Sequence, residues 1–257
     1  MRNHRLLLLG ALALLGTVAA CDGPNDPASG RVAISLGTLP NSLAKANRPG
    51  LAAGSETFML GDDTLVVNSV ELVLKHVEFD TQDDSTLCNM EGEGEFEGDC
   101  NELEVGPLLA DLPLGGGIAR LFTVPVPAGT YEELEFLIHK PGMGGEDAAF
   151  VAAHPAFQGI SIRVTGLFNG QPFTFTSRVT AHQEQEFPTP VVVAANTPLD
   201  VTILVDVSGW FVDETGTQFV DPATALPGQP NEHQVSDNIR RSFKAFRDQD
   251  GDCHEDD

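Results

Sequence analysis

Basic residues are scarce in this chain of 257 residues. Lys and Arg number 14 against 38 Asp and Glu, which gives a formal net charge of −24. Proteins that recognise the phosphate backbone of nucleic acids do so through clustered Lys and Arg. The charge therefore argues against nucleic acid as a partner.

Motifs of common active sites are also missing. The chain has no Gly-x-Ser-x-Gly nucleophile elbow, no His-Glu-x-x-His zinc motif, no phosphate-binding Gly-rich loop and no dinucleotide fingerprint. Six histidines follow residue 20, and no two of them have zinc-ligand spacing: His76, His139, His154, His182, His233 and His254. We therefore do not expect an enzyme. A hydrolase whose site is assembled from separate loops, with a histidine, a carboxylate and a serine, is kept as an alternative.

The amino terminus has the features of an export signal in their usual order. Arg2 and Arg5 supply positive charge, and Leu6 to Ala20 is an apolar stretch too short to span a bilayer comfortably. The stretch ends in Val18-Ala19-Ala20-Cys21, which resembles the bacterial lipobox. In lipobox proteins the Cys sulfur receives a diacylglyceryl group, the peptide is cut before the Cys, and the new amino terminus is acylated. The resemblance implies that residues 1–20 are a signal peptide and that Cys21 carries the lipid.

Lipid attachment at Cys21 implies a protein exported from the cytoplasm and held at a membrane of the bacterial cell envelope. Several acyl chains anchor a protein stably where a single chain does not. The acidic chain itself would be repelled by anionic head groups, so the lipid must provide the attachment. Residues 21–30 are polar and rich in Pro and Gly, which predicts a flexible tether. The alternative is an ordinary cleaved signal, with Cys21 as a structural cysteine; inner versus outer membrane stays open.

Residues 31–230 have the pattern of a mainly β protein. Apolar and polar residues alternate from Ile160 to Phe168 and again from Phe173 to Ala181, on either side of the turn sequence 169–172. Leu65 to Phe79 is apolar on both sides in places, which predicts a central strand or a pair of strands. Further strands are expected over 32–36, 121–126, 131–138, 191–194 and 201–207. Several short strands with Gly/Pro turns and an antiparallel hairpin predict an antiparallel β-sandwich.

Two helices are expected beside these strands. The first covers Asp147 to Ala153 and is ended by Pro155. The second belongs to residues 231–257, which we divide into a C-terminal amphipathic helix and an acidic tail. Asn231 is a good N-cap residue, and one helical stripe is formed by Val235, Ile239, Phe243 and Phe246. We expect this stripe to pack on the sandwich, although its basic residues also suit a membrane or a partner.

Cysteines and acidic segments give the remaining site predictions. Cys88 and Cys100 lie in one hydrophilic loop of an exported chain, so we expect them to form a disulfide. Cys253 is then left without an assigned partner. Seven acids follow one another in 91–104, where a solvated loop is expected and calcium binding is the alternative. Those acids are Glu91, Glu93, Glu95, Glu97, Asp99, Glu102 and Glu104.

The acidic tail resembles half of an EF-type calcium loop. Asp248, Asp250 and Asp252 match its positions 1, 3 and 5, but Cys253 stands where Gly is required. The chain also ends before position 12, where the loop has its bidentate Glu. We therefore expect no cofactor, and calcium at Asp248, Asp250 and Asp252 is an alternative to a simple acidic tail.

A wider resemblance joins these features. Pro127-Ala128-Gly129-Thr130-Tyr131 looks like a turn that precedes a strand in many bacterial β-sandwich modules, with the Tyr131 hydroxyl placed to hold the corner. Together with residues 160–177 and 201–213, the chain resembles a family of uncharacterised bacterial lipoproteins. The resemblance implies a secreted, β-rich domain and assigns no catalytic residues. We predict a lipid-anchored binding or structural module with an unknown envelope or extracellular ligand; a calcium-dependent adhesion or scaffold protein is the second hypothesis.

Overall fold

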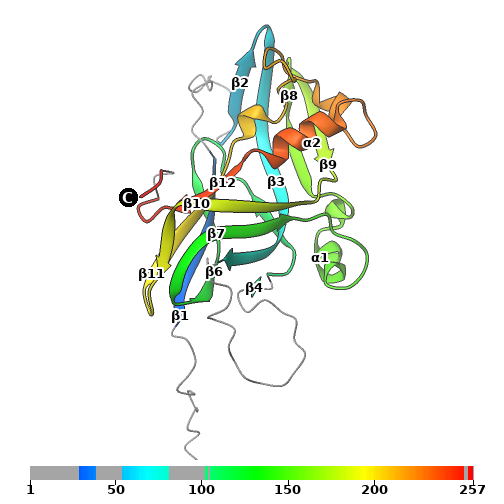
Figure 1. Cartoon of the computed structure of the whole chain (residues 1–257). Coiled ribbons are helices and arrows are strands. Elements are labelled where there is room, and N and C mark those ends of the chain that lie inside the picture. Colours follow the sequence, from blue (N-terminus) through cyan, green and yellow to red (C-terminus); the bar gives the residue numbers. More distant parts are fainter. Residues whose placement is uncertain (1–28, 39–53, 81–101, 104, 252–253, 257) are drawn as a thin grey trace, which may run out of the picture.

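The structure is a computed structural model that describes residues 29–38, 54–80, 102–103, 105–251 and 254–256. Within these ranges the chain is mainly β, as the alternating sequence pattern predicts. Twelve strands form two open sheets, and two short α-helices lie beside them (Figure 1). Cys21, Cys88, Cys100, Asp252 and Cys253 lie outside the described residues, as does the acidic loop up to residue 101 and residue 104.

The smaller sheet has four strands in the order β12–β11–β1–β6. Its parallel pair differs from the purely antiparallel prediction, because β1 runs alongside β11 with Ile34 opposite Val201. β1 lies between β11 and β6, which come from distant parts of the chain, and it runs antiparallel to β6. The strand bounds are β1 Ser29–Thr38, β6 Ile118–Pro127, β11 Pro198–Val205 and β12 Phe243–Arg247.

The larger sheet has eight strands built around β3, with the main order β10–β7–β3–β8–β9. The long apolar run predicted as a central strand is β3, and five strands pair with it. A strand buried on both faces needs apolar residues on both, which explains its lack of clean alternation. The strand bounds are β2 Glu56–Leu60, β3 Asp63–Asp80, β4 Glu102–Leu103, β5 Leu108–Asp111, β7 Gly129–Ile138, β8 Ile162–Phe168, β9 Gln171–Ser177 and β10 Ala181–Val193.

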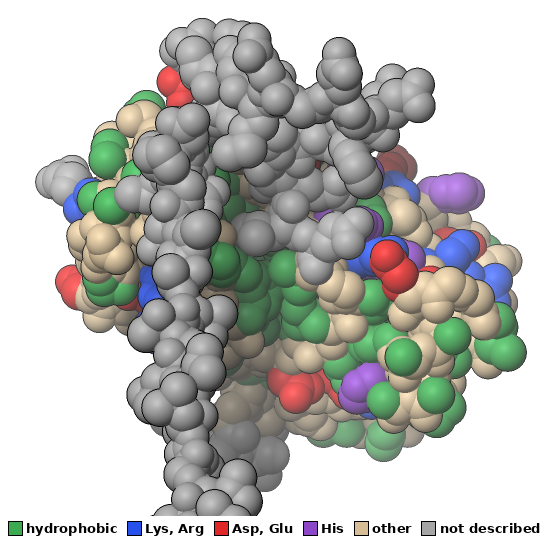
Figure 2. Space-filling view, turned by 90° about the horizontal axis from the view of Figure 1, so that it is seen from below, with side chains coloured by type: hydrophobic (Ala, Val, Ile, Leu, Met, Phe, Trp, Pro, Cys, Tyr) green, Lys and Arg blue, Asp and Glu red, His purple; other side chains and the backbone are tan. Residues whose placement is uncertain are grey.

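Helical segments are short. The first predicted helix is confirmed as α1 Asp147–Ala153, and the second α-helix is α2 Glu232–Arg240. Three 3₁₀ turns complete the described elements: η1 Pro155–Phe157, η2 Val207–Gly209 and η3 Pro222–Ala225. Seen from below, the Lys, Arg and His side chains lie mostly on the side of the molecule that carries α1 (Figure 2).

One hydrophobic core joins the two sheets. Its members include Ile34 and Ile203 from the smaller sheet and Leu72, Phe136 and Phe175 from the larger one, all essentially buried. The single Trp of the chain, Trp210, is fully buried in the same core, and its indole N–H donates to Ser242 Oγ at 2.8 Å. Buried Trp residues need such a partner because an unpaired N–H costs free energy.

The corner between β6 and β7 is held as the sequence predicts. The Tyr131 hydroxyl donates a hydrogen bond to the Pro127 carbonyl oxygen at 2.8 Å, and the ring is fully buried. The chain passes here from the smaller sheet to the larger one. Asn169 and Gly170 likewise form the predicted hairpin turn between β8 and β9, both with positive φ.

The predicted C-terminal helix is correct at its start and wrong in its second half. Helix α2 ends at Arg240, and Phe243 and Phe246 lie on β12, which pairs with β11. Phe243 packs against Phe136 with ring centroids 5.6 Å apart, whereas Phe246 packs with Leu204 on the other face. A strand with two buried faces buries both rings and also supplies hydrogen-bond partners for the open edge of β11. A continuous helix cannot do both.

Candidate functional site

Six acidic side chains form two rows across β3, β7 and β10. In the first row Glu135 lies opposite Glu184 on one side and Glu78 on the other. In the second row Glu133 lies opposite Glu186 and Asp80. We call these six residues the acidic face: Glu78, Asp80, Glu133, Glu135, Glu184 and Glu186.

The alternation of each strand places these acids on one side of the sheet. On β7 the residues between and beside the acids, Leu134 and Phe136, are buried in the core. On β3 the same holds for Val77 and Phe79. Because successive side chains on a strand point to opposite faces, the acids are directed away from the core. The pairing register then sets acid against acid, an arrangement that destabilises a sheet when the charges are not neutralised.

The electrostatic repulsion is strongest at the centre of the acidic face. Carboxylate oxygens of Asp80, Glu133 and Glu135 lie within 4.8 Å of one another. Partial burial, together with the nearby Asp80 carboxylate, raises the pKa of Glu135 to about 7. Burial and the charge of Glu184 also raise the pKa of Glu133 above its ordinary value. The raised pKa of Glu135 means that this group retains a proton near neutral pH.

A cavity of about 220 Å³ lies alongside the first row. Two imidazoles, His76 and His182, border it together with Glu78 and Glu135, and Phe136 and Leu137 complete its lining. His76 has a positive φ of 49° at an irregularity in the β3–β7 pairing, between Lys75 and Val77. Such bulges redirect a side chain locally. We call this space the His76–His182 cavity.

Cation binding is the chemistry that these groups can perform. Carboxylate oxygens are the preferred ligands of calcium and magnesium, and imidazole suits zinc and other transition metals. The six positions of the acidic face include no Lys or Arg. The nearby Lys75 binds Glu146 of the α1 N-terminus at 2.8 Å.

This arrangement is not among the sites that the sequence motifs predict. Its signal is nevertheless present as acids at alternate positions, Glu133 and Glu135 on one strand and Glu184 and Glu186 on another. Period-two acids predict an outward-facing row on each strand. Which rows lie side by side depends on the strand order, and a single sequence does not state it.

The tail residues predicted as calcium ligands are described only in part. Asp248 is buried, and its Oδ1 accepts a hydrogen bond from the Gly251 N–H at 2.9 Å. Asp256 returns toward this turn, because its N–H donates to the Arg247 carbonyl at 3.1 Å and its carboxylate accepts from the Gln249 N–H. Among the described residues, the close group of three metal-ligating side chains lies on the acidic face and not here. Calcium at Asp248 and Asp250 stays a prediction.

Three histidines that could serve the hydrolase alternative, His139, His154 and His182, lie in different settings. His139 Nε2 lies 2.7 Å from Asp147 Oδ1, and the Asp147 carboxylate also accepts the Gly142 N–H at 2.6 Å. His154 packs against the Phe150 ring, and His182 borders the cavity described above. Among the described residues no serine hydroxyl is hydrogen-bonded to His139. The His139–Asp147 pair therefore joins β7 to α1 and does not by itself assemble a hydrolytic site.

The fold and the site define a mainly β protein with two sheets, one shared core and an acidic sheet face. Comparison of the chain with protein-family models, curated proteins and solved structures finds no match. No function is therefore carried over from a relative. No helix within the described ranges is long and apolar enough to cross a lipid bilayer.

Proposed function

We propose that this chain is a lipid-anchored protein of the bacterial cell envelope, in which a β-sandwich acts as a binding module. The lipobox sequence that ends at Cys21 supports the anchor. The shared core of the two sheets supports the sandwich, with α2 beside it and β12 as part of the smaller sheet. In this proposal the domain is held outside the cytoplasm by acyl chains on Cys21.

The anchor is tested with Cys21→Ser. Loss of the acceptor sulfur removes the diacylglyceryl group, so the variant should leave the membrane fraction and appear in the soluble fraction. Cys253→Ser is the matched control, because it removes a thiol that the lipobox does not contain, and it should stay with the membrane. Membrane association of Cys21→Ser equal to that of the unaltered chain would refute the anchor.

We infer that the ligand of the binding module includes a divalent cation held by the acidic face. The observation that carries this inference is the register of β3, β7 and β10, which sets six carboxylates in two rows beside a cavity with two imidazoles. Like charges opposite one another on neighbouring strands are unfavourable, and a bound cation removes that cost. This feature favours the calcium-dependent adhesion or scaffold role, with Asp80, Glu133 and Glu135 as the central ligands.

Thermal unfolding of the purified chain, with and without calcium, tests the cation site. A ligand that binds only the folded state stabilises it by about 2.7 kcal/mol at 100 times its Kd. We expect millimolar calcium to raise the melting temperature of the EDTA-treated protein, and the Glu133→Gln/Glu135→Gln double variant to lose this increase. Glu214→Gln removes an exposed acid in a turn outside the acidic face, and this control should keep the increase.

Two further measurements locate the cation. The Asp248→Asn/Asp250→Asn variant should respond to calcium like the unaltered chain if the acidic face is the site, and should lose the response if the tail is. Zinc in place of calcium tests the imidazoles of His76 and His182, because nitrogen ligands favour zinc. The absence of a shift with either cation would contradict the cation site and leave the anchor unaffected.

A further inference from the structure

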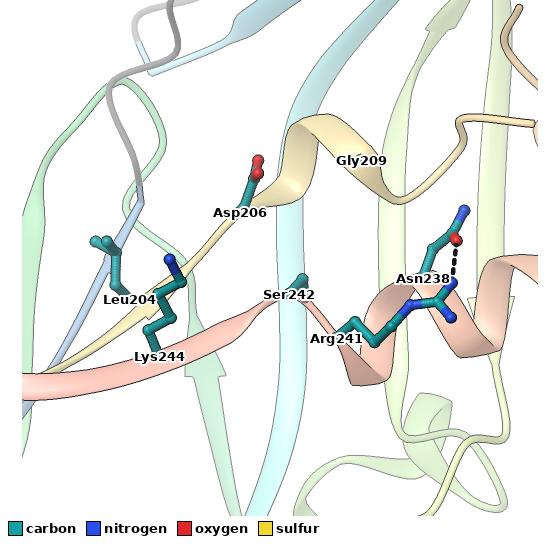
Figure 3. Close-up of a pocket in the computed structure, with 7 residues that line it drawn as sticks. All are labelled: Leu204, Asp206, Gly209, Asn238, Arg241, Ser242 and Lys244. Carbon is teal, nitrogen blue, oxygen red and sulfur yellow. Dashed lines mark hydrogen bonds between the residues drawn. The ribbon is translucent and has the colours of Figure 1, made fainter. Parts of the chain in front are cut away.

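A second cavity, of about 270 Å³, lies on a different part of the molecule, where α2 ends and β12 begins (Figure 3). Lys244 extends from β12 beside Leu204 of β11, and Arg241 extends from the end of α2 beside Asn238. Ser242 lies between them, and Asp206 and Gly209 border the opposite side. We call this space the Arg241–Lys244 cavity.

Two bases face this cavity without an acidic partner. No carboxylate among the described residues forms an ion pair with Arg241 or Lys244. The adjacent Arg240 differs from them, since its guanidinium pairs with Asp237 at 2.6 Å. Arg241 and Lys244 therefore combine two features: neither has an ion-pair partner among the described residues, and both line the same cavity.

Asp206, the acid that borders the cavity, is already engaged. Its Oδ1 accepts hydrogen bonds from the Ser208 N–H at 3.0 Å and from the Ser208 hydroxyl, so it caps the 3₁₀ turn η2. A carboxylate that accepts two local hydrogen bonds has less capacity to neutralise a base across the cavity. The cavity therefore carries two positive charges against one committed negative charge.

Hydrogen bonds hold Arg241, on one side of the cavity, in a fixed position. The Asn238 amide nitrogen donates to the Trp210 and Val212 carbonyl oxygens at 3.1 and 2.9 Å, which sets the direction of its Oδ1. That oxygen accepts a hydrogen bond from the Arg241 guanidinium at 3.0 Å. The Ser242 hydroxyl donates to the Ile239 carbonyl at 2.7 Å while accepting the indole N–H of the buried Trp210. Arg241 is thus connected to the core and loses little freedom when it binds a ligand.

We propose that the Arg241–Lys244 cavity binds a small organic anion through its carboxylate or phosphate groups, with Arg241 and Lys244 as basic contacts on either side of Ser242. Guanidinium presents paired N–H donors that match the oxygens of either group, and Lys adds a point charge. The volume suits a compact ligand, and Leu204 provides an apolar contact for its carbon part. This site is separate from the acidic face and takes a ligand of the opposite charge.

The net charge of the protein makes the proposal easy to test. A chain with a formal charge of −24 repels anions in general, so saturable binding of an anion requires a specific site. The full chain is first stripped of divalent cations with EDTA and transferred to EDTA-free buffer, because EDTA is itself a carboxylate ligand. Isothermal titration calorimetry, with succinate and with inorganic phosphate as separate probes, then measures this binding in the absence of divalent cations. The two probes distinguish a carboxylate ligand from a phosphate ligand.

Three single substitutions provide the comparison. Arg241→Gln and Lys244→Gln should each weaken binding of the preferred probe by about tenfold or more, because each removes a charged hydrogen-bond donor. Arg240→Gln makes the same change in net charge at a neighbouring residue that does not line the cavity, so it should bind like the unaltered chain. All three side chains are exposed, and circular dichroism is expected to show an unchanged fold.

Equal weakening in all three variants would overturn the proposal, because it would indicate an effect of overall charge. Failure of both probes to bind saturably would overturn it as well. Neither result bears on the cation site, which is measured with calcium and with substitutions on the acidic face.

Discussion

At the scale of single residues, one close neighbour can decide which amino acid a position accepts. Gly166 occupies a position of β8 where the alternation calls for an apolar residue. A Cβ there would lie 2.0 Å from the Val66 carbonyl oxygen of β3, so no side chain fits. Glycine is thus required where two strands approach closely. The alternating pattern of β8 is visible in the sequence. The need for glycine at position 166 is not, because it comes from the close approach of the Val66 carbonyl oxygen on the neighbouring strand.

Glu135 gives a prediction for the pH dependence of stability. Its pKa in the folded chain is raised to about 7 by burial and by Asp80, from an ordinary value of 4.5. A raised carboxyl pKa means that the folded state holds the proton more tightly than the unfolded state. Stability then falls as the pH rises from about 4.5 to about 7, and the full penalty is present above that range.

The substitution Glu135→Gln removes this penalty. In EDTA at pH 8 we expect its melting temperature to exceed that of the unaltered chain by about 2 °C, a small shift because solvent screens a partly exposed site. The difference should disappear as the pH approaches 4.5. Glu214→Gln, measured beside it, should show no such dependence. A gain at pH 8 that persists unchanged at pH 4.5 would show that the repulsion is not the cause.

At the scale of elements, local pattern and tertiary contact agree for most strands and for α1. They diverge after Arg240, where the sequence spacing of Phe243 and Phe246 fits a helix. Phe is also favoured in strands. The open edge of β11, from Val201 to Val205, pairs with five residues of β12, and this pairing decides for the strand. The start of α2 was correctly placed, but Asn231 does not cap it through its side chain, which bonds Thr224 instead.

Helix α1 depends on Asp147 for its attachment to the sheet. Burial alone would raise the pKa of Asp147, but the Gly142 N–H and the His139 imidazole lower it on balance. Stability from a lowered carboxyl pKa is present above the ordinary value near 3.8 and is lost as the pH falls below it. We expect Asp147→Asn to lower the free energy of unfolding by about 1–2 kcal/mol at pH 7, measured by urea denaturation.

The control for this substitution is Asp237→Asn. Asp237 also pairs with a base, but on the exposed surface of α2, where such pairs contribute about 0–1 kcal/mol. As the pH falls below 3.8, the difference in stability between the Asp147→Asn variant and the unaltered chain should shrink. A loss of the same size at pH 3 and at pH 7 would contradict a role for the ionised carboxylate.

At the scale of the whole molecule, charge and attachment are separate questions. A chain with 24 more acids than bases cannot hold to an anionic membrane by electrostatic attraction. If the acyl chains on Cys21 provide the attachment, a wash in high salt should leave the protein on the membrane while Cys21→Ser releases it. With attachment provided by the lipid, the protein surface needs no basic patch for membrane binding. Its acids gather across β3, β7 and β10, and two bases lie beside one cavity at the end of α2.

The sequence by itself determined the mainly β class, the strand alternation, the β6–β7 corner and the start of both helices, because these depend on residues close together in the chain. Tertiary structure decided the strand order, the parallel pairing of β1 with β11 and the strand at 243–247. It also brought Glu133 of β7 beside Asp80 of β3 and Glu186 of β10. Alternation fixes which face a side chain takes, whereas only the register between strands fixes its neighbours, and charge clusters are made of neighbours.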